Sequence, residues 1–383
     1  MLRIFLTSSH LSAILQSIYA ESTKQEGYVD VLITDYPPQK KKLTELIMST
    51  SGIYKWDKQF NYAEELKDGA NLKPSFKKRF LRKFKQFPLI KNVYGLLLSR
   101  YMKNKLLNFE RILREDFKNI KHQNVQLNVL TKTGLNEVLF KIYPDAEINY
   151  FEHGMGDYMY FFQNQIKKGN FYCVFNEEFS LFLKERNHSM SNKIYGYLQS
   201  GKFEDSIKKL EQSGVVKMTG DINYAMDCPI IFILMESVEI YQVPAHFWTD
   251  YIDICLSKIP DPEKFIFIIK PHPSQSFDAI LITKNYFEQK GLKYNIQEQA
   301  GEINMSAEVM FYFLQEKTEY VFCIFSSSIY YLSKLYPNHK IKYYYGYDLF
   351  SKYIHNSPKQ FVDIYKGVEP IIKNVLSKDC LEL

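Results

Sequence analysis

Short apolar runs alternate along the chain with stretches whose apolar residues recur at helical spacing. Continuous apolar runs, such as residues 229–235 and 265–269, are typical of strands in a parallel sheet that is covered on both faces. The pattern predicts strands over residues 2–8, 28–36, 125–133, 147–151, 229–235, 264–273, 293–297, 320–325 and 340–345. It predicts helices over residues 9–21, 37–47, 135–142, 203–212, 245–257, 277–290, 305–315, 326–335 and 360–376. This β/α alternation indicates parallel sheets flanked by helices.

The alternation is interrupted between residues 158 and 220, where Tyr and Phe residues cluster and only the helix at 203–212 stands out. A chain of 383 residues is long enough for two domains. We therefore predict an α/β protein with two Rossmann-like β/α domains and a cleft between them. The expected N-terminal, acceptor-side domain covers residues 1–220, and the expected C-terminal, nucleotide-sugar-binding domain covers residues 221–383.

A basic segment that we expect to be a helical insertion, about residues 74–121, interrupts the first domain. Residues 73–121 hold fifteen Lys and Arg against three acidic residues, a local charge of +12 in a chain whose net charge is +6. Such a block is either solvated helix surface or a contact for an anionic membrane or an acidic glycan. No RNA-binding signature accompanies it, so nucleic acid is not an expected partner.

Cysteine usage and the start of the chain indicate the compartment. The five cysteines are scattered, which argues against a disulfide framework or a zinc module. Residues 7–10 interrupt the apolar start too early for a signal peptide, and no apolar run approaches the ~18 residues that span a bilayer. We expect a cytoplasmic protein that attaches peripherally to the inner face of the cell membrane through the basic block.

Polar residues follow three of the predicted strands. They are Lys-Pro-His-Pro at 270–273, Glu-His-Gly-Met-Gly-Asp at 152–157, and three serines at 326–328. In open α/β sheets, ligands bind outside the carboxyl ends of the strands. Each group taken alone also fits a turn or a helix cap, but their joint occurrence predicts a shared site.

These groups supply a base, an imidazole and an anion-binding helix start. Glu152 can take the proton of an acceptor hydroxyl, and His272, held between two prolines, can assist a departing phosphate. Ser326, Ser327 and Ser328 offer hydroxyl and N–H groups to an anion at the positive end of a helix. This arrangement predicts transfer from a nucleotide-activated donor without a metal or other cofactor.

The same residues resemble the motifs of the bacterial sialyltransferases of GT-B fold, which modify lipooligosaccharide, O-antigen or capsule. Glu152 matches the family's general base, His272 its His-Pro motif and Ser327 its serine pair. The resemblance implies a GT-B-like fold and a metal-independent, inverting transfer of sialic acid from CMP-sialic acid to a glycan hydroxyl. It also implies that Glu308 binds the ribose of CMP. His153 departs from the pattern, because the family has an acidic residue there.

The predicted site residues divide by partner. The donor-binding residues are Lys270, Pro273, Glu308, Ser326, Ser327 and Ser328. The acceptor-binding residues are Ser8, Ser9, His153, Gly154 and Asp157.

Three alternatives stay open. One is a teichoic-acid-type CDP-glycerol glycerophosphotransferase, because His153 and Gly154 fit the first motif of that family. Another is a capsule transferase that uses a different CMP-activated acid. The third is a glycan-binding or membrane scaffold without nucleotide binding, which would use only the basic block.

Overall fold

The computed structural model describes two compact units. The first comprises Met1–Phe151 and Lys168–Asn170, and the second Glu152–Lys167 and Phe171–Leu383. The residues described are 1–34, 49–61, 107, 110–115, 117, 124–131, 134–163, 165–166, 168–198, 201–216, 228–236, 238–244, 246–272, 275–297, 305–337 and 340–383.

A seven-stranded sheet with the order β3-β2-β1-β4-β5-β6-β7 holds the first half of the chain. Its strands are β1 (Leu2–Thr7), β2 (Val29–Thr34), β3 (Lys58–Asn61), β4 (Val125–Leu130), β5 (Glu147–Phe151), β6 (Asn170–Tyr172) and β7 (Ile194–Tyr195). Strand β1 pairs in parallel with both β2 and β4, and every residue of β1 is buried. A continuous apolar strand therefore forms the centre of the sheet, as its sequence predicts.

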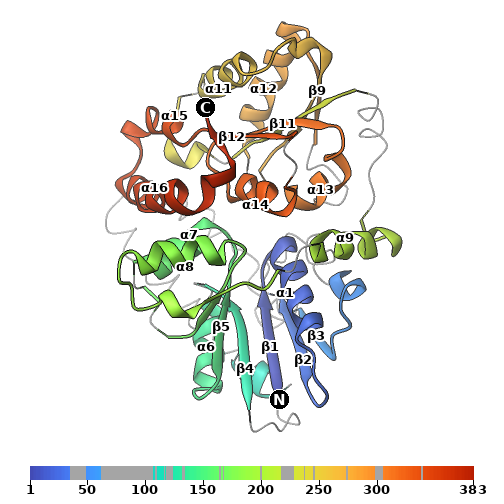
Figure 1. Ribbon diagram of the computed structural model, residues 1–383, viewed down its shortest axis with the longest axis vertical. Helices are drawn as coiled ribbons and strands as arrows, with labels where there is room; N and C mark the ends of the chain where they lie inside the picture. Colours follow the sequence, from blue (N-terminus) through green and yellow to red (C-terminus); the bar gives the residue numbers. More distant parts are fainter. Residues whose placement is uncertain are drawn as a thin grey trace, which may run out of the picture. The chain divides into compact units, whose positions relative to one another are not determined.

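Two helices connect central strands of this sheet, α1 (His10–Ser22) between β1 and β2 and α6 (Gly134–Ile142) between β4 and β5 (Figure 1). The two connections run in opposite directions along the strand order, so right-handed crossovers place the helices on opposite faces. Ser9 begins α1, because its side chain accepts a hydrogen bond from the Ser12 N–H at 3.1 Å.

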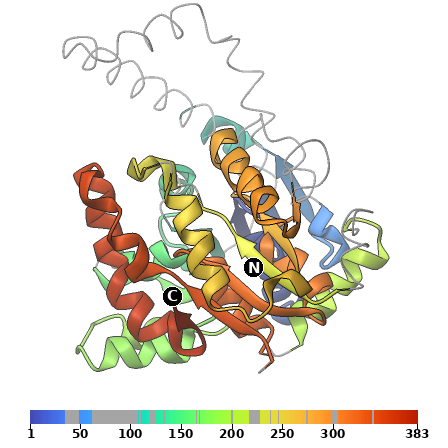
Figure 2. The same ribbon diagram turned by 90° about the horizontal axis from the view of Figure 1, so that it is seen from above.

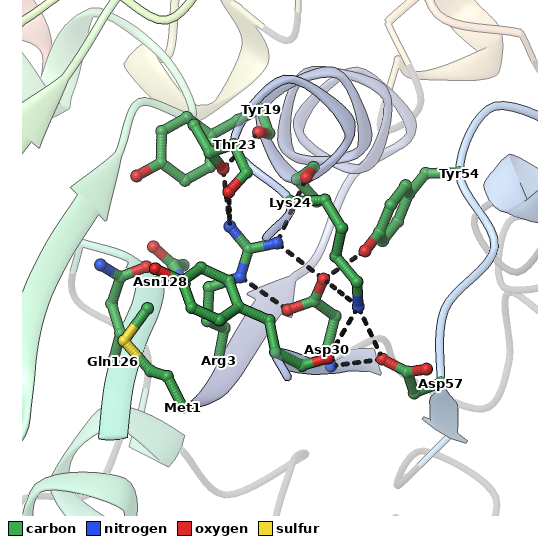
Figure 3. A network of polar contacts seen from close by, with 12 residues as sticks. Met1, Arg3, Tyr19, Thr23, Lys24, Asp30, Tyr54, Asp57, Gln126 and Asn128 are labelled. Atoms are coloured by element: carbon green, nitrogen blue, oxygen red, sulfur yellow. Dashed lines mark hydrogen bonds and ion pairs between the residues drawn. The ribbon is translucent and has the colours of Figure 1, made fainter. Parts of the chain in front are cut away.

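A buried ion pair joins the amino ends of β1 and β2 (Figure 3). Arg3 and Asp30 are register partners in the parallel pair, and the Arg3 Nε lies 2.6 Å from the Asp30 Oδ1. Lys24 lies 3.1 Å from Asp30 and 3.0 Å from Asp57, and the Tyr54 hydroxyl donates to Asp30. Burial raises the pKa of Asp30, but the hydrogen bonds and the charge of Arg3 outweigh burial and lower it below its ordinary value.

The second unit contains a six-stranded parallel sheet with the order β10-β9-β8-β11-β12-β13. Its strands are β8 (Ile230–Leu234), β9 (Ile266–Lys270), β10 (Lys293–Ile296), β11 (Thr318–Cys323), β12 (Lys342–Tyr345) and β13 (Leu381–Glu382). Helices α11 (Phe247–Ser257) and α12 (Phe277–Lys290) lie side by side, as Figure 2 shows. The connections through α13 (Ala307–Leu314) and α14 (Ser327–Leu335) run in the opposite direction, which places these helices on the other face.

The remaining helices of the second unit are α7 (Met155–Phe162), α8 (Asn176–Lys184), α9 (Lys202–Gln212), α15 (Tyr347–Ser351) and α16 (Lys359–Ile371), which continues as a π-helix over Ile372–Leu376. Helix α16 packs against α7. A Cβ atom at Gly367 would lie 2.8 Å from the sulfur of Met159, so glycine permits this close approach.

The structure confirms the predicted α/β class with two Rossmann-like parallel sheets. The predicted strands and helices outside residues 158–200 are present, usually within a few residues of the expected bounds, where they fall in the described ranges. The sequence pattern missed α7, α8, α15 and the short strands β3, β6, β7 and β13. The predicted helix at 37–47 lies outside the described residues, as does nearly all of the basic segment. The domain boundary predicted near 220 also lies outside them and stays a prediction.

Candidate functional site

The loops that leave β8, β9 and β11 meet at the carboxyl edge of the six-stranded sheet. Strand β8 lies between β9 and β11, and the chain proceeds from it in one direction to β9 and later in the other to β11. This reversal is a topological switch point, where open α/β sheets bind their ligands. Leu234 and Lys270 are register partners at the ends of β8 and β9, so the residues that follow them emerge together.

Lys270, the last residue of β9, is buried with 8% of its surface exposed. Burial lowers its pKa to about 8, while the negative charge of Glu308 acts in the opposite direction. Its carbonyl accepts a hydrogen bond from the Met235 N–H at 2.9 Å. His272 is exposed two residues later, and its carbonyl accepts from Gln275. Pro273 lies outside the described residues.

Glu308, in the first turn of α13, is 3% exposed. Burial raises its pKa, and hydrogen bonding, including a bond from Ser328, together with the charge of Lys270 opposes the rise. The structure therefore brings Lys270, Glu308 and Ser328 into one cluster. Their roles as donor-binding residues stay predictions.

Ser326 is the N-cap of α14, and its side chain accepts from the Ser328 N–H at 3.3 Å. Ser326, Ser327 and Ser328 are all partly exposed, so the start of this helix is open to a ligand. A Cβ atom at Gly154 would lie 3.4 Å from the Ser327 hydroxyl. The turn at residues 152–157 therefore lies against the first residue of α14.

Glu152 is buried at the end of β5 and accepts four hydrogen bonds. Its Oε1 accepts from the Val174 N–H at 2.7 Å and from the Tyr197 hydroxyl at 2.8 Å. Its Oε2 accepts from the Tyr158 hydroxyl at 2.5 Å and the Tyr331 hydroxyl at 3.1 Å. Burial raises its pKa to about 7, against the lowering effect of these donors. Because Tyr331 belongs to α14, Glu152 connects the turn to that helix.

A base with a pKa near 7 suits proton transfer at neutral pH. Both oxygens of Glu152 are nevertheless engaged by protein donors, so an acceptor hydroxyl would have to displace one of them. The role of Glu152 as a base therefore stays a prediction.

The other predicted acceptor-binding residues have structural partners or lie in the first unit. Asp157, in the first turn of α7, accepts from the N–H groups of His153 and Gly154 and so closes the turn. The side chain of His153 is exposed. Ser8 and Ser9 follow β1 in the first unit, and Ser9 caps α1. Their contacts with an acceptor stay predictions.

The sequence analysis overlooked two residues. Glu236, two residues after β8, is 6% exposed, and its Oε1 accepts from the Phe325 N–H at 2.8 Å. Burial raises its pKa to about 8, although hydrogen bonds from backbone N–H groups at Phe325, Ser326 and Ile324 lower it. Its position after an apolar strand was the available signal. His10 is fully buried, neither ring nitrogen has a hydrogen-bond partner, and no sequence pattern marks it.

The described residues contain no group of three or more His, Cys, Asp or Glu that could hold a metal ion. A cavity of about 510 Å³ lies away from this cluster, lined in part by Lys334, Lys342 and Asp379. Lys342 begins β12, so this cavity is at the amino edge of the sheet. No helix within the described ranges is long and apolar enough to cross a membrane.

Comparison with known proteins identifies the fold. No family model matches the sequence, and no curated protein matches it. Among solved structures, S. aureus MnaA in a co-structure with UDP is similar at 9% identity, over 90% of this chain and 79% of that one, with a TM-score of 0.52. A putative UDP-N-acetylglucosamine 2-epimerase from Listeria monocytogenes is similar at 9% identity, over 98% of this chain and 92% of that one, with a TM-score of 0.51. The likeness supports the GT-B-like fold class.

The predicted membership of the sialyltransferase family is wrong. The two similar structures are a protein in complex with UDP and a putative UDP-N-acetylglucosamine 2-epimerase. No family model, including any of the sialyltransferases, matches this sequence. CMP-sialic acid as the donor and its transfer to a surface glycan are therefore wrong as well. The CDP-glycerol alternative and the capsule transferase with another CMP-activated acid are likewise unsupported. The physical reason is that short polar motifs after parallel strands are what this sheet topology requires of any ligand site. They indicate the fold and leave the nucleotide unspecified.

Proposed function

We propose that this protein is an enzyme that acts on a UDP-sugar and binds UDP at the carboxyl edge of the six-stranded sheet. The observation that carries the proposal is the cluster of buried Lys270 and Glu308 with the partly exposed Ser328 at the switch point. The likeness to a protein in complex with UDP supports the fold in which this cluster lies.

The cluster offers complementary groups to the two polar parts of UDP. The Glu308 carboxylate can accept hydrogen bonds from the two ribose hydroxyls. The Lys270 ammonium group, with the hydroxyls of Ser327 and Ser328 at the positive end of α14, can bind the diphosphate. The buried carboxylate would thus bind the ribose hydroxyls, and the buried ammonium group beside it would bind the diphosphate.

We propose that the bond between the anomeric carbon of the sugar and the diphosphate oxygen breaks, while a hydroxyl oxygen of an acceptor sugar or of water bonds to that carbon and releases its proton. The departing UDP gains negative charge on its diphosphate, which Lys270 and the start of α14 would stabilise. His272, exposed at the end of β9, is the candidate acid for the departing phosphate. UDP-N-acetylglucosamine is the first substrate to test, because the putative activity of the Listeria protein names it.

Binding of UDP is tested by thermal shift and calorimetry with UDP, CMP and GDP. UDP at 100 times its dissociation constant should stabilise the fold by about 2.7 kcal/mol, and the other two nucleotides by less at equal concentration. Lys270→Met should weaken UDP binding, whereas Lys264→Met, at an exposed side chain two residues before the same strand, should not. Equal stabilisation by CMP, or none by any nucleotide, would contradict the proposal.

The reaction is tested by incubating the protein with UDP-N-acetylglucosamine, with and without an added sugar acceptor. Phosphorus and proton NMR should show free UDP, a transferred sugar or a changed sugar nucleotide. If UDP binds and the sugar nucleotide stays intact under all these conditions, the chemical step is wrong and only nucleotide binding stands.

A further inference from the structure

We propose that Glu236 is a positioning residue, which holds the loop between β11 and α14 in the conformation that binds the diphosphate. The identity of the ligand rests on the proposed function. The position of the loop does not, and it can be tested without a ligand.

The carboxyl group of Glu236 reaches across the switch point. Glu236 follows β8, while its hydrogen-bond partner Phe325 follows β11, 89 residues later in the chain. Backbone N–H groups of Ile324 and Ser326 also lie close enough to its carboxyl group to lower its pKa. Three successive backbone N–H groups thus converge on one side chain, as they do in anion-binding backbone nests. The next residues along the chain are the serines of the proposed diphosphate site.

The segment of residues 235 and 236 also contacts Lys270, the proposed ammonium ligand of the diphosphate. Met235, the residue before Glu236, donates its N–H to the carbonyl of Lys270 at 2.9 Å. Residues 235 and 236 therefore contact both the backbone of Lys270 and the loop that leads to Ser327. One short segment sets the spacing between the proposed ammonium and serine ligands of the diphosphate.

The chemistry of a carboxyl group suits this role better than that of any neutral side chain of similar size. An ionised carboxyl group presents two acceptor oxygens, and a protonated one can still accept at both once its proton turns away from the loop, whereas a glutamine has one acceptor oxygen and an NH₂ group that would face a backbone N–H. Burying a carboxyl group is costly unless hydrogen bonds satisfy it. No ion pair to Glu236 is found among the described residues, so the loop amides are the partners that satisfy it.

Hydrogen exchange without nucleotide tests the positioning. In Glu236→Gln the amides of residues 323–328 should exchange at least tenfold faster than in the wild-type protein, because one acceptor is lost. The matched control is Glu382→Gln, since Glu382 accepts a backbone N–H from Asp348 at 2.8 Å elsewhere in the same unit. The control should raise exchange near residue 348 and leave residues 323–328 unchanged.

UDP affinity, measured by calorimetry on the same proteins, tests the consequence. Glu236→Gln should raise the dissociation constant about tenfold, Glu236→Asp should fall between it and the wild type, and Glu382→Gln should match the wild type. If the wild type binds UDP and Glu236→Gln changes neither loop exchange nor affinity, the inference is wrong. If the wild type fails to bind UDP while loop exchange rises, the proposed function is wrong and the positioning stands. Should Glu236→Gln fail to fold, Glu236→Asp with wild-type exchange and affinity overturns the inference.

Discussion

Lys270 is buried at the end of β9, and this burial determines the pH range in which its side chain is charged. Its ammonium group is buried beside Glu308, and burial lowers its pKa to about 8, so it is charged below that pH and increasingly neutral above it. A phosphate ligand is bound best by the charged form.

UDP affinity should therefore fall as the pH rises above about 8, by up to about tenfold per pH unit, since one unit of pKa corresponds to about 1.4 kcal/mol. Lys270→Met should bind UDP more weakly at neutral pH and lose this part of the pH dependence. Calorimetry from about pH 6.5 to about pH 9 measures both, with Lys264→Met expected to keep the wild-type profile. A profile in Lys270→Met identical to that of the wild type would exclude Lys270 as the titrating group.

At the scale of elements, a single buried ion pair between strands β1 and β2 contributes to the stability of the fold. Arg3 and Asp30 are register partners with side chains 1% and 0% exposed, so neither charge is solvated by water. Removal of one member leaves the other charge buried without its partner, which costs about 3–5 kcal/mol.

Asp30→Ala should lower the free energy of unfolding by about this amount, whereas Asp57→Ala, at the half-exposed end of the same network, should cost at most about 1 kcal/mol. The folded pKa of Asp30 is lowered, so its contribution is present above the ordinary carboxyl pKa and is lost as the pH falls. Urea unfolding at neutral and acidic pH measures both effects. Equal losses for the two variants would show that the pair is not the source of stability.

At the scale of the whole molecule, the pH dependence of stability is the sum of contributions from several buried groups. Some of these contributions are lost as the pH rises and others as it falls. Glu152 has its pKa raised to about 7, so its contribution is complete below the ordinary carboxyl pKa and is lost as the pH rises toward 7. Glu236 acts in the same direction, up to about pH 8. His10 has its pKa lowered to about 3 by burial, so its contribution is lost as the pH falls below its ordinary pKa. The net slope of the wild-type protein therefore identifies no single group.

The difference between variant and wild type isolates Glu152. Relative to the wild type, the free energy of unfolding of Glu152→Gln should rise with pH by up to about 1.4 kcal/mol per unit between about pH 5 and pH 7. Glu178→Gln serves as the control, because Glu178 pairs with Lys334 on α14 in the same unit. Parallel curves for Glu152→Gln and wild type would mean that Glu152 is already ionised throughout this range.

Local patterns in the sequence determined most of the elements and several of the site positions. Continuous apolar runs predicted the strands β8, β9 and β11. Lys270 at the end of β9 and Ser328 after β11 both act on Glu308. These predictions succeed because burial on both faces requires apolar residues within a strand, while its end is where polar residues return. Helix α7 was missed because its buried residues, which run from Asp157 to Phe161, lie on several sides and obscure a helical period. Helix α8 buries Phe179, Phe182 and Leu183 on one face, but it has nine residues, too few for this period to stand out among the neighbouring aromatic residues.

Only the tertiary structure decided which strand ends are neighbours and which side chains satisfy one another. Glu236 and Phe325 are 89 residues apart, and they meet because β8 and β11 pair at the centre of the sheet. Glu152 meets Tyr331 across 179 residues, and no local pattern encodes that distance. Short motifs pointed to a CMP-sugar and were misleading, because residue spacing at strand ends reflects the topology, whereas nucleotide identity depends on contacts to the base. Local periodicity in a sequence shows which residues are buried, but burial alone does not determine which residues contact one another.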